Sequence, residues 1–417
     1  MYLTNEEKRM LNGEEGYAAQ KSMQILVALG ESFGAENMVP VSSCHLPGAS
    51  FKLLGEAGLM FVKEMGAKGG KVRVFTTTNP TSCDCDCSTC DRLAIDGQFI
   101  HAQAEVTQAY QNLGVVTCGS CSPYLIGNAP RFGQHAAWGE SSAVVYANSV
   151  LGARTNREGG PSALAAAITG RTPNYGMHLG KNRAGNLLIH VPEPLHGIEA
   201  YGTLGYAVGR ISKTAIPVFE GIPTSVSFDE LKSLGSALAT SGATALFHVV
   251  GVTPEAPDRE HALNGKKPEM EIYYDKQMRM NAIEHLTLTE KTDDIDWLYI
   301  GCPQCSLQEV RYVAELLRGQ KVADNVDFWI CTSTPIKELA AQMGYVQAIE
   351  EAGAILVCQT CPAHAPHESI CRTRRYQSLT TDSAKMAHYA AGEVSMPVHY
   401  GSTEAVVRAA IAKRWEA

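Results

Sequence analysis

The sequence predicts an α/β protein built around parallel sheets. Stretches with apolar residues at helical spacing alternate with short runs of β-branched and aromatic residues over most of the 417-residue chain. Two capping boxes, Ser227 with Glu230 and Ser306 with Glu309, mark the starts of two helices. Strands and helices that alternate at these lengths are typical of sheets whose parallel strands are connected by helices.

The elements follow in order along the chain. In the first half, apolar periodicity predicts helices beginning at Ala19 and covering 51–67 and 100–114. Strands are expected between them at 38–43, 71–78 and 115–119. In the second half, helices follow the two capping serines, and strand-like runs occupy 244–252, 296–301, 327–333 and 354–360. The segment 171–226 is rich in Gly, Pro and Asn and shows no clear period.

Length and composition narrow the class of protein. Hydrophobic residues make up 45% of the chain and charged residues 19%, which is typical of a folded globular protein. We place a domain boundary near Pro223, giving an N-terminal α/β region at 1–222 and a C-terminal α/β region at 223–417. The net charge of -8 is spread along the chain, which argues against a nucleic-acid surface. No apolar run is long enough for a membrane span and no export signal is seen, so we expect a cytoplasmic protein.

Thirteen cysteines are the most unusual feature of the composition. Because the cytosol keeps thiols reduced, metal binding or catalysis is a better expectation for them than a disulfide framework. Four pairs have Cys-x-x-Cys spacing: Cys87 and Cys90, Cys118 and Cys121, Cys302 and Cys305, and Cys358 and Cys361.

Three of these cysteines follow predicted strands directly. Cys121 comes after the strand at 115–119, and Cys302 and Cys361 come after the strands at 296–301 and 354–360. Open α/β sheets bind their ligands at the carboxyl ends of parallel strands, so these thiols are expected to converge. Three thiolates suggest a [4Fe-4S] cluster with one open iron that acts as a Lewis acid. A zinc site and simple packing of buried cysteines remain open at this point.

A long segment resembles a known family. The run "AWGESSAVVYANSVLGARTNREGGPSALAAAITGRTPNYGMHL" at 137–179 is similar to the signature of the aconitase X family, the large subunits of iron-sulfur hydro-lyases. Further matches are "TTTNP" at 76–80, "CSPYLIGN" at 121–128, "GCPQCSL" at 301–307 and "TDSAKMAHY" at 381–389. The first residues are most similar to the archaeal type of large subunit that acts on phosphomevalonate. The resemblance implies an aconitase-superfamily-like fold, with parallel-sheet domains around a central Fe-S cleft and without the swivelling domain.

The resemblance also assigns site residues. It implies that Cys121, Cys302 and Cys361 hold the cluster, with Cys118, Cys305 and Cys358 as neighbours. It places substrate contacts at Gly48, Ala49, Ser50, Asn79, Pro80, Glu140, Ser141, Ser142 and Lys385. From their chemistry, Arg154 and Arg157 either grip a carboxylate or phosphate of the substrate or form ion pairs that brace their glycine-rich loop. Asp382 stands where the family usually has Asn.

The implied reaction is the dehydration of mevalonate 5-phosphate to anhydromevalonate 5-phosphate in a modified mevalonate pathway. Dehydration of cis-3-hydroxy-L-proline is the alternative within the family, and a non-catalytic metal-binding or redox-sensing protein is the alternative of another class. No certain catalytic base is expected in this chain. In the family a serine of a swivelling domain takes the proton, so we expect a separate small subunit as partner.

The loop at 81–90 is not part of the family pattern. Its cysteines, Cys83, Cys85, Cys87 and Cys90, are expected to form a peripheral zinc or cluster site or a lid near the pocket, or to bind no metal. The nuclearity of the main cluster and the oligomeric state are left open by the sequence.

Overall fold

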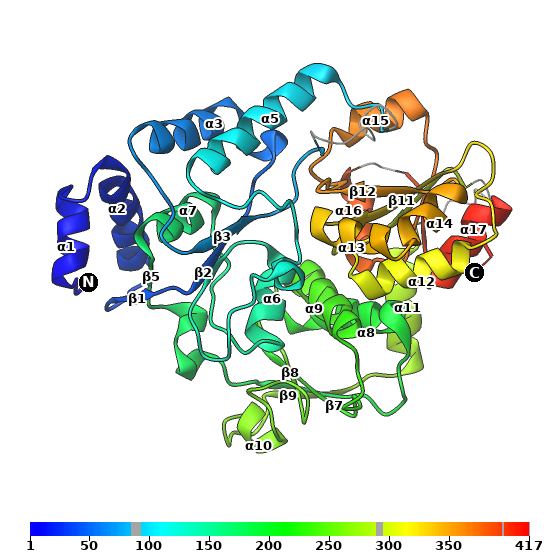
Figure 1. The fold of residues 1–417 in the computed structure, drawn as a ribbon. Coiled ribbons are helices and arrows are strands. Elements are labelled where there is room, and N and C mark those ends of the chain that lie inside the picture. The colour runs from blue at the N-terminus through cyan, green and yellow to red at the C-terminus, as the bar shows by residue number, and fades with distance from the viewer. Residues whose placement is uncertain (85–92, 289–294, 394–395, 417) are drawn as a thin grey trace.

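The structure is a computed structural model, and it describes residues 1–84, 93–288, 295–393 and 396–416. Its described strands form four sheets, three of them parallel throughout. Figure 1 shows the N-terminal sheet and the C-terminal sheet on opposite sides of the molecule, with α6 (Ser141–Ser149), α8 (Gly197–Ser212) and α9 (Phe228–Gly242) between them. None of the helices in the described ranges has the length and apolar character needed to cross a membrane.

The N-terminal part is centred on a short parallel sheet with the strand order β3-β2-β4. Its core is formed by apolar side chains of helices that pack on β2. A two-stranded antiparallel pair, β1 with β5, lies beside it. The strands are β1 (Met38–Pro40), β2 (Ser43–Leu46), β3 (Phe75–Thr78), β4 (Ala137–Trp138) and β5 (Arg171–Pro173). The remaining helices are α1 (Asn5–Asn12), α2 (Tyr17–Ser32), α3 (Phe51–Ala67), α5 (Gly97–Asn112) and α7 (Gly160–Thr169).

The middle part contains a parallel sheet with the order β8-β7-β6-β9. Its strands are β6 (Leu187–His190), β7 (Pro217–Glu220), β8 (His248–Val249) and β9 (Met270–Tyr273), and its further helices are α10 (Arg259–Ala262) and α11 (Lys276–Leu286). The helices α8 and α9 pack closely because α8 carries glycines at the contact. A Cβ on Gly205 would come within 2.4 Å of the carbonyl oxygen of Leu234, so only glycine lets the two backbones approach this far.

The C-terminal part is a five-stranded parallel sheet with the order β12-β11-β10-β13-β14. Buried apolar side chains, aromatic as well as aliphatic, line its central strands, as expected for a sheet covered on both faces. The strands are β10 (Trp297–Ile300), β11 (Asp327–Thr332), β12 (Ile355–Cys358), β13 (Leu379–Thr381) and β14 (Val398–Tyr400). The helices are α12 (Leu307–Leu317), α13 (Thr334–Gln342), α14 (Tyr345–Glu351), α15 (His367–Arg374), α16 (Ala384–Glu393) and α17 (Thr403–Ala412).

Several sequence expectations can be compared with these elements. Both capping boxes are present, with Ser227 and Ser306 accepting from the backbone of Glu230 and Glu309. The strands at 296–301, 327–333 and 354–360 correspond to β10, β11 and β12. The middle sheet has strands on both sides of residue 223, so it spans the boundary that the sequence suggested.

The predicted strand at 115–119 is wrong. Only Val116 pairs with β3, through a single bridge to Thr77. The chain then turns at Gly119, whose φ of +57° favours glycine, and a Cβ there would lie 2.6 Å from the Cβ of Gln359. The segment 115–119 leaves the sheet after Val116, and at Gly119 it packs against Gln359 in the loop that follows β12.

Candidate active site

The predicted site residues lie where parallel strands end. In the N-terminal sheet, residues 47–50 follow β2, 79–80 follow β3 and 140–142 come shortly after β4. In the C-terminal sheet, Cys302 follows β10, Cys361 follows β12 and Lys385 follows β13. Two sheets therefore contribute the loops at their carboxyl ends, the edge at which open α/β sheets bind ligands.

The loops of Cys121 and Cys302 are joined by one residue. The backbone N-H of Gln304 donates to the Sγ of Cys121 at 3.2 Å, and its side-chain Nε2 donates to the carbonyl of Gly119 at 3.0 Å. The hydroxyl of Ser383 donates to the carbonyl of Cys302. Gln304 thus holds together two segments that are far apart in the sequence.

The loop of Cys361 is joined to the N-terminal part by backbone hydrogen bonds. Thr81 donates to the carbonyl of Gln359 at 2.7 Å, and Cys361 donates to the carbonyl of Thr81 at 3.1 Å. The Nδ1 of His364 lies 3.3 Å from the carbonyl of Pro80. A chain segment that follows β3 is therefore paired with the segment that carries Cys361.

The three thiols share one electrostatic environment. Burial raises the pKa of Cys121 to about 12 and also raises the pKa values of Cys302 and Cys361. Within this trio, a neighbouring thiolate raises the pKa of a thiol, whereas the Lys385 ammonium lowers the pKa of all three thiols. Mutual influence of this kind requires proximity, so the structure brings these three cysteines and Lys385 together.

This donor set fits an iron-sulfur cluster. Three partly exposed thiols with one neighbouring cation would be stabilised as thiolates by a bound metal centre. Among the described residues, no three His, Cys, Asp or Glu side chains are grouped closely enough to hold one metal ion. The ligands of an iron-sulfur cluster need not be grouped around one metal ion, because each thiolate binds a separate iron atom and the ligands are spaced around the cluster.

An ion pair stands beside the thiols. The Nζ of Lys385 lies 2.6 Å from the Oε1 of Glu140 and near the hydroxyls of Ser141 and Ser142, at 3.4 and 3.5 Å. Ser142 also donates to Glu140 at 2.8 Å. Burial alone would raise the pKa of Glu140, but the Lys385 ammonium outweighs burial and brings the pKa down to about 2. The pKa of Lys385 is raised, because Glu140 and the nearby thiols outweigh burial.

The loop at 48–50 is anchored to the segment after β3. Gln103 of α5 donates to the carbonyl of Ala49 at 3.0 Å, and its Oε1 accepts from the backbone N-H groups of Phe51 and Ser82. Ser50 is the N-cap of α3 and accepts from Leu53. The positive end of α3 therefore points toward the loops that carry the predicted substrate contacts.

The two predicted arginines have different surroundings. Arg157 is exposed and close enough to Glu140 to lower its pKa. Arg154 donates to the carbonyl of His178 at 3.1 Å and thereby braces the loop that it belongs to. Arg157 is thus available to an anionic ligand, whereas Arg154 braces its loop through a backbone carbonyl and not through the ion pair that the sequence suggested as one alternative.

Two further residues were missed by the sequence analysis. His45, inside β2, is fully buried, and burial lowers its pKa to about 4, although Glu140 and a hydrogen bond with Asn79 favour the charged form. Lys232 of α9 is 3% exposed and contacts Glu309, Asp229 at 3.3 Å and the carbonyl of Gln304 at 3.2 Å. A lone polar residue within a strand or helix is ambiguous in a sequence, so neither position gave a usable signal.

The remaining cysteines are placed as follows. Cys118, Cys305 and Cys358 are buried, and Cys118 donates to the carbonyl of Thr78 at 3.5 Å. In the 81–90 loop, Cys83 is buried among apolar residues, including Leu93. Cys85, Cys87 and Cys90 lie outside the described residues, so the predicted role of this loop stays a prediction.

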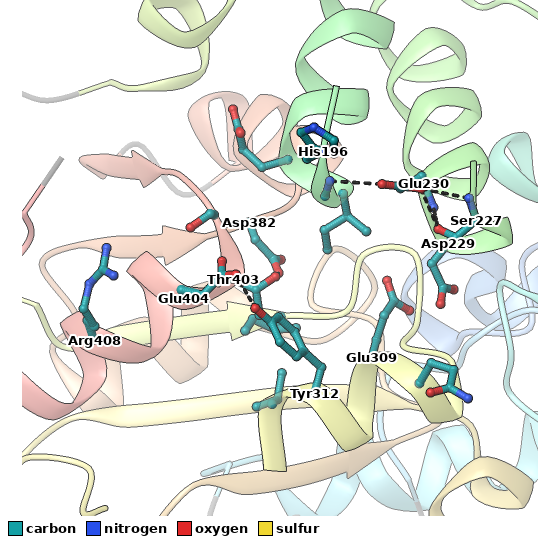
Figure 2. Close-up of a pocket in the computed structure, with 17 residues that line it drawn as sticks. His196, Ser227, Asp229, Glu230, Glu309, Tyr312, Asp382, Thr403, Glu404 and Arg408 are labelled. Atoms are coloured by element: carbon teal, nitrogen blue, oxygen red, sulfur yellow. Dashed lines mark hydrogen bonds between the residues drawn. The ribbon is translucent and has the colours of Figure 1, made fainter. Parts of the chain in front are cut away.

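Figure 2 shows a cavity of about 730 Å³ whose lining includes Ile300, the last residue of β10. None of the three predicted cluster ligands lines it. Its walls come from the N-terminal ends of α8 and α9 and from α12 and α17, with six carboxylates: Glu199, Asp229, Glu230, Glu309, Asp382 and Glu404. Asp382, the departure from the family pattern, accepts a hydrogen bond from Thr403 at 2.7 Å.

Comparisons with known proteins cover nearly the whole chain. Three family models match in succession: "Aconitase X first domain" at 1–181, "Aconitase X second domain" at 185–284 and "Aconitase X third domain" at 295–412. The crystal structure of Thermococcus kodakaraensis aconitase X in its holo-form is 38% identical, with a TM-score of 0.88 over 98% of this chain and 100% of that chain.

Two curated relatives carry different substrate names. The phosphomevalonate dehydratase large subunit of Methanothermobacter thermautotrophicus is 44% identical over 98% of this chain and 98% of its own length. The cis-3-hydroxy-L-proline dehydratase of Hypocrea jecorina is 33% identical over 98% of this chain and 68% of its own length. The α/β fold of the aconitase type that the sequence predicted is confirmed. By family models that match all three parts of the chain, and by relatives of nearly equal length, the chain belongs to the aconitase X family.

Proposed function

We propose that this chain is the large subunit of a phosphomevalonate dehydratase, which removes water from mevalonate 5-phosphate. The observation that carries the proposal is the 44% identity, over nearly the full length of both chains, to a large subunit of that name. The relative that dehydrates cis-3-hydroxy-L-proline is more distant, at 33%. The product would be anhydromevalonate 5-phosphate, an intermediate of a modified mevalonate pathway.

The proposed cofactor is a [4Fe-4S] cluster bound by Cys121, Cys302 and Cys361. The three partly exposed thiols, which influence one another's pKa values, and the neighbouring Lys385 support this assignment. When bound, such a cluster would supply a Lewis acid for the departure of the hydroxyl group.

The chain's own residues bind and orient the substrate. Lys385 presents a fixed ammonium, held by Glu140, to an anionic group of the hydroxy acid. Arg157, which is exposed, provides a second cation on the same side. The capped start of α3, at 48–50, and Asn79 and Pro80, which follow β3, would provide further groups that favour a carboxylate or phosphate.

A small subunit completes the site. The phosphomevalonate dehydratase relative is named a large subunit, and the chain spans 68% of the longer cis-3-hydroxy-L-proline dehydratase. We assign to the partner, a swivelling-domain subunit, the base that takes the proton from the carbon next to the leaving hydroxyl. The isolated chain is therefore expected to be nearly inactive.

The second candidate substrate is cis-3-hydroxy-L-proline, which shares the hydroxyl and carboxylate but has no phosphate. A phosphate requirement discriminates the two. A non-catalytic metal-binding or redox-sensing protein, the alternative of another class, predicts bound metal without dehydration of either compound.

The test is anaerobic purification of the chain with its candidate small subunit, followed by iron and sulfide analysis and a water-elimination assay on both substrates. We expect turnover of mevalonate 5-phosphate that needs both subunits and disappears in Cys302→Ser. Cys44→Ser is the matched control, because Cys44 is also buried but lies within β2. Turnover of the proline derivative alone would overturn the substrate assignment, and full activity without the partner would overturn the two-subunit assignment.

A further inference from the structure

Gln304 follows Cys302 by two residues and joins its loop to two other segments of the chain. Its backbone N-H donates to the Sγ of Cys121 at 3.2 Å, and its side-chain Nε2 donates to the carbonyl of Gly119 at 3.0 Å. Its own carbonyl accepts from the Nζ of Lys232 at 3.2 Å. Because Gln304 is only 3% exposed, water hardly competes for these hydrogen bonds.

The partners of Gln304 belong to different parts of the chain. Gln304 itself lies in the part matched by the third family model, Cys121 in the part matched by the first and Lys232 in the part matched by the second. Lys232 is in turn held by the carboxylates of Asp229 and Glu309. The three parts therefore meet at one residue, which passes the position of α9 and of the loop after β10 on to Cys121.

The side chain of Gln304 fixes the direction of its backbone N-H. The two nitrogens of this residue bind Gly119 and Cys121, which are two positions apart, so backbone and side chain hold the same short segment at two points. A contact at two points fixes both distance and orientation, whereas a single hydrogen bond leaves the segment free to turn. A Cβ on Gly119 would lie 2.6 Å from the Cβ of Gln359, so the segment also packs closely against the loop after β12. The fold therefore directs the N-H of Gln304 at the Cys121 sulfur.

An N-H that points at a cysteine sulfur affects a metal group bound to that sulfur. The hydrogen bond withdraws electron density from the thiolate and partly offsets its negative charge. Hydrogen bonds to the sulfurs are among the features that set the reduction potential of an iron-sulfur cluster, and a donor that stabilises negative charge makes reduction easier. The partners of metal ligands also orient those ligands, and their loss weakens metal binding. The contact from Gln304 to Cys121 combines both effects.

We propose that Gln304 is a positioning residue for the iron-sulfur cluster. Its N-H binds the Cys121 sulfur and raises the reduction potential of the bound cluster, while its side chain and Lys232 hold that N-H in place. This inference rests on the proposed function, because it takes Cys121 to be a cluster ligand. It does not depend on which hydroxy acid is dehydrated, and it assigns a task in the cluster site to a residue outside the proposed ligands.

Two variants separate the backbone N-H from the side chain. Gln304→Met keeps the N-H and a side chain of similar length but loses the donor to Gly119, whereas Gln304→Pro also loses the N-H. A redox titration of cluster-loaded protein, followed by electron paramagnetic resonance, should give a lower reduction potential for Gln304→Met than for the unsubstituted protein, and the lowest for Gln304→Pro. Gln320 is exposed in the same part of the chain, so Gln320→Met is the control and should not shift the potential. A potential that is unchanged in both Gln304 variants would overturn the proposal.

Deuterium identifies the hydrogen bond itself. Resonance Raman spectra are recorded for protein loaded with the cluster in H2O and in D2O, after the apo-protein has exchanged its amides. The iron-thiolate stretching bands should differ between the two solvents in the unsubstituted protein and in Gln304→Met, and the difference should be smaller in Gln304→Pro. A general loosening of the site does not remove an isotope effect selectively, so equal differences in all three proteins would overturn the assignment of the N-H. If Gln304→Pro does not fold, the potential of Gln304→Met still decides the proposal.

The role of the side chain is tested without cluster or substrate. Hydrogen-deuterium exchange of the apo-protein, measured by mass spectrometry, should be about fivefold faster around 119–122 in Gln304→Met, as for the loss of one buried hydrogen bond. Peptides from β6 should exchange at an unchanged rate, which shows that the fold is intact. Unchanged exchange at 119–122 would overturn the positioning role of the side chain.

These measurements separate this inference from the proposed function. A protein that binds no iron and sulfide would overturn the proposed cofactor and the inference together. A cluster that is bound with the same potential in all Gln304 variants would overturn the inference alone. The expected shifts in potential and exchange would support the role of Gln304 even if neither hydroxy acid is consumed.

Discussion

Removal of the Lys385 ammonium should destabilise the folded protein in a pH-dependent way. Glu140 is 8% exposed, and Lys385 lowers its pKa from 4.5 to about 2. At 1.36 kcal/mol per pKa unit this corresponds to about 3 kcal/mol of stability, in line with the roughly 3–5 kcal/mol for breaking a buried ion pair. Lys385→Met should therefore lower the free energy of unfolding by about 3 kcal/mol at pH 8.

The sign of the pH dependence follows from the same pair. In the unsubstituted protein the depressed pKa of Glu140 gives stability that is present above pH 4.5 and is lost only as the pH falls toward 2. In Lys385→Met, the ammonium that lowers the pKa of Glu140 is gone, while burial still raises it. The pKa of Glu140 should therefore rise above its ordinary value. At high pH the variant is destabilised by the buried charge of Glu140, and this destabilisation decreases as Glu140 takes up a proton. The loss in the free energy of unfolding, relative to the unsubstituted protein, should therefore be smaller at pH 5 than at pH 8.

Urea-induced unfolding of cluster-loaded protein at both pH values measures this difference. Lys385→Arg keeps the charge and serves as the control, and Glu140→Gln completes a double-mutant cycle that isolates the pair. A loss below about 1 kcal/mol at pH 8, or an equal loss at both pH values, would refute the reasoning, because it would mean that solvent already screens the pair.

Three further predictions concern the metal site and its support. Replacing the four cysteines of the 81–90 loop by serine should leave the iron content and visible absorbance of the main cluster unchanged; loss of that absorbance would place the loop in the cluster site. Iron uptake by the apo-protein, followed by absorbance, should strengthen from pH 6 to pH 9, because burial raises the pKa of Cys121 to about 12 and binding must release protons; a flat profile would contradict this. Lys232→Met should lower the free energy of unfolding by about 1–3 kcal/mol in urea, because the partly buried Glu309 and Asp229 lose their cation, and an unchanged transition would show that this cation is dispensable.

The position of cysteines directly after predicted strands identified the three proposed cluster ligands, but the prediction was sound for only two of them. Cys302 and Cys361 follow β10 and β12, whose continuous apolar runs are easily read as buried parallel strands. Cys121 was reached through a strand that does not exist, and it lies near the others because Gly119 lets its loop meet Gln359. Periodicity cannot report such a contact, since it depends on two backbones more than two hundred residues apart.

Other parts of the site depend on tertiary geometry alone. Arg154 and Arg157 share one loop, yet one braces that loop and the other is exposed near Glu140. Their spacing in the sequence is compatible with either outcome. His45 lies inside β2 with the surroundings of a core residue, and its contacts with Thr77 and Trp138 become visible only in the folded chain. The sequence thus indicates which loops meet, while the direction of single side chains needs the folded chain.

The contact between Gln304 and Cys121 joins residues 183 positions apart. During synthesis, the N-terminal sheet is available to fold while the later two cysteines have not yet been made. Cys121 is therefore without the other two proposed ligands until the chain has grown past residue 361 and the five-stranded sheet has formed. Assembly of the proposed cluster would consequently be a late step in the biogenesis of this protein, and a chain truncated before β12 would lack Cys361, one of the three proposed ligands.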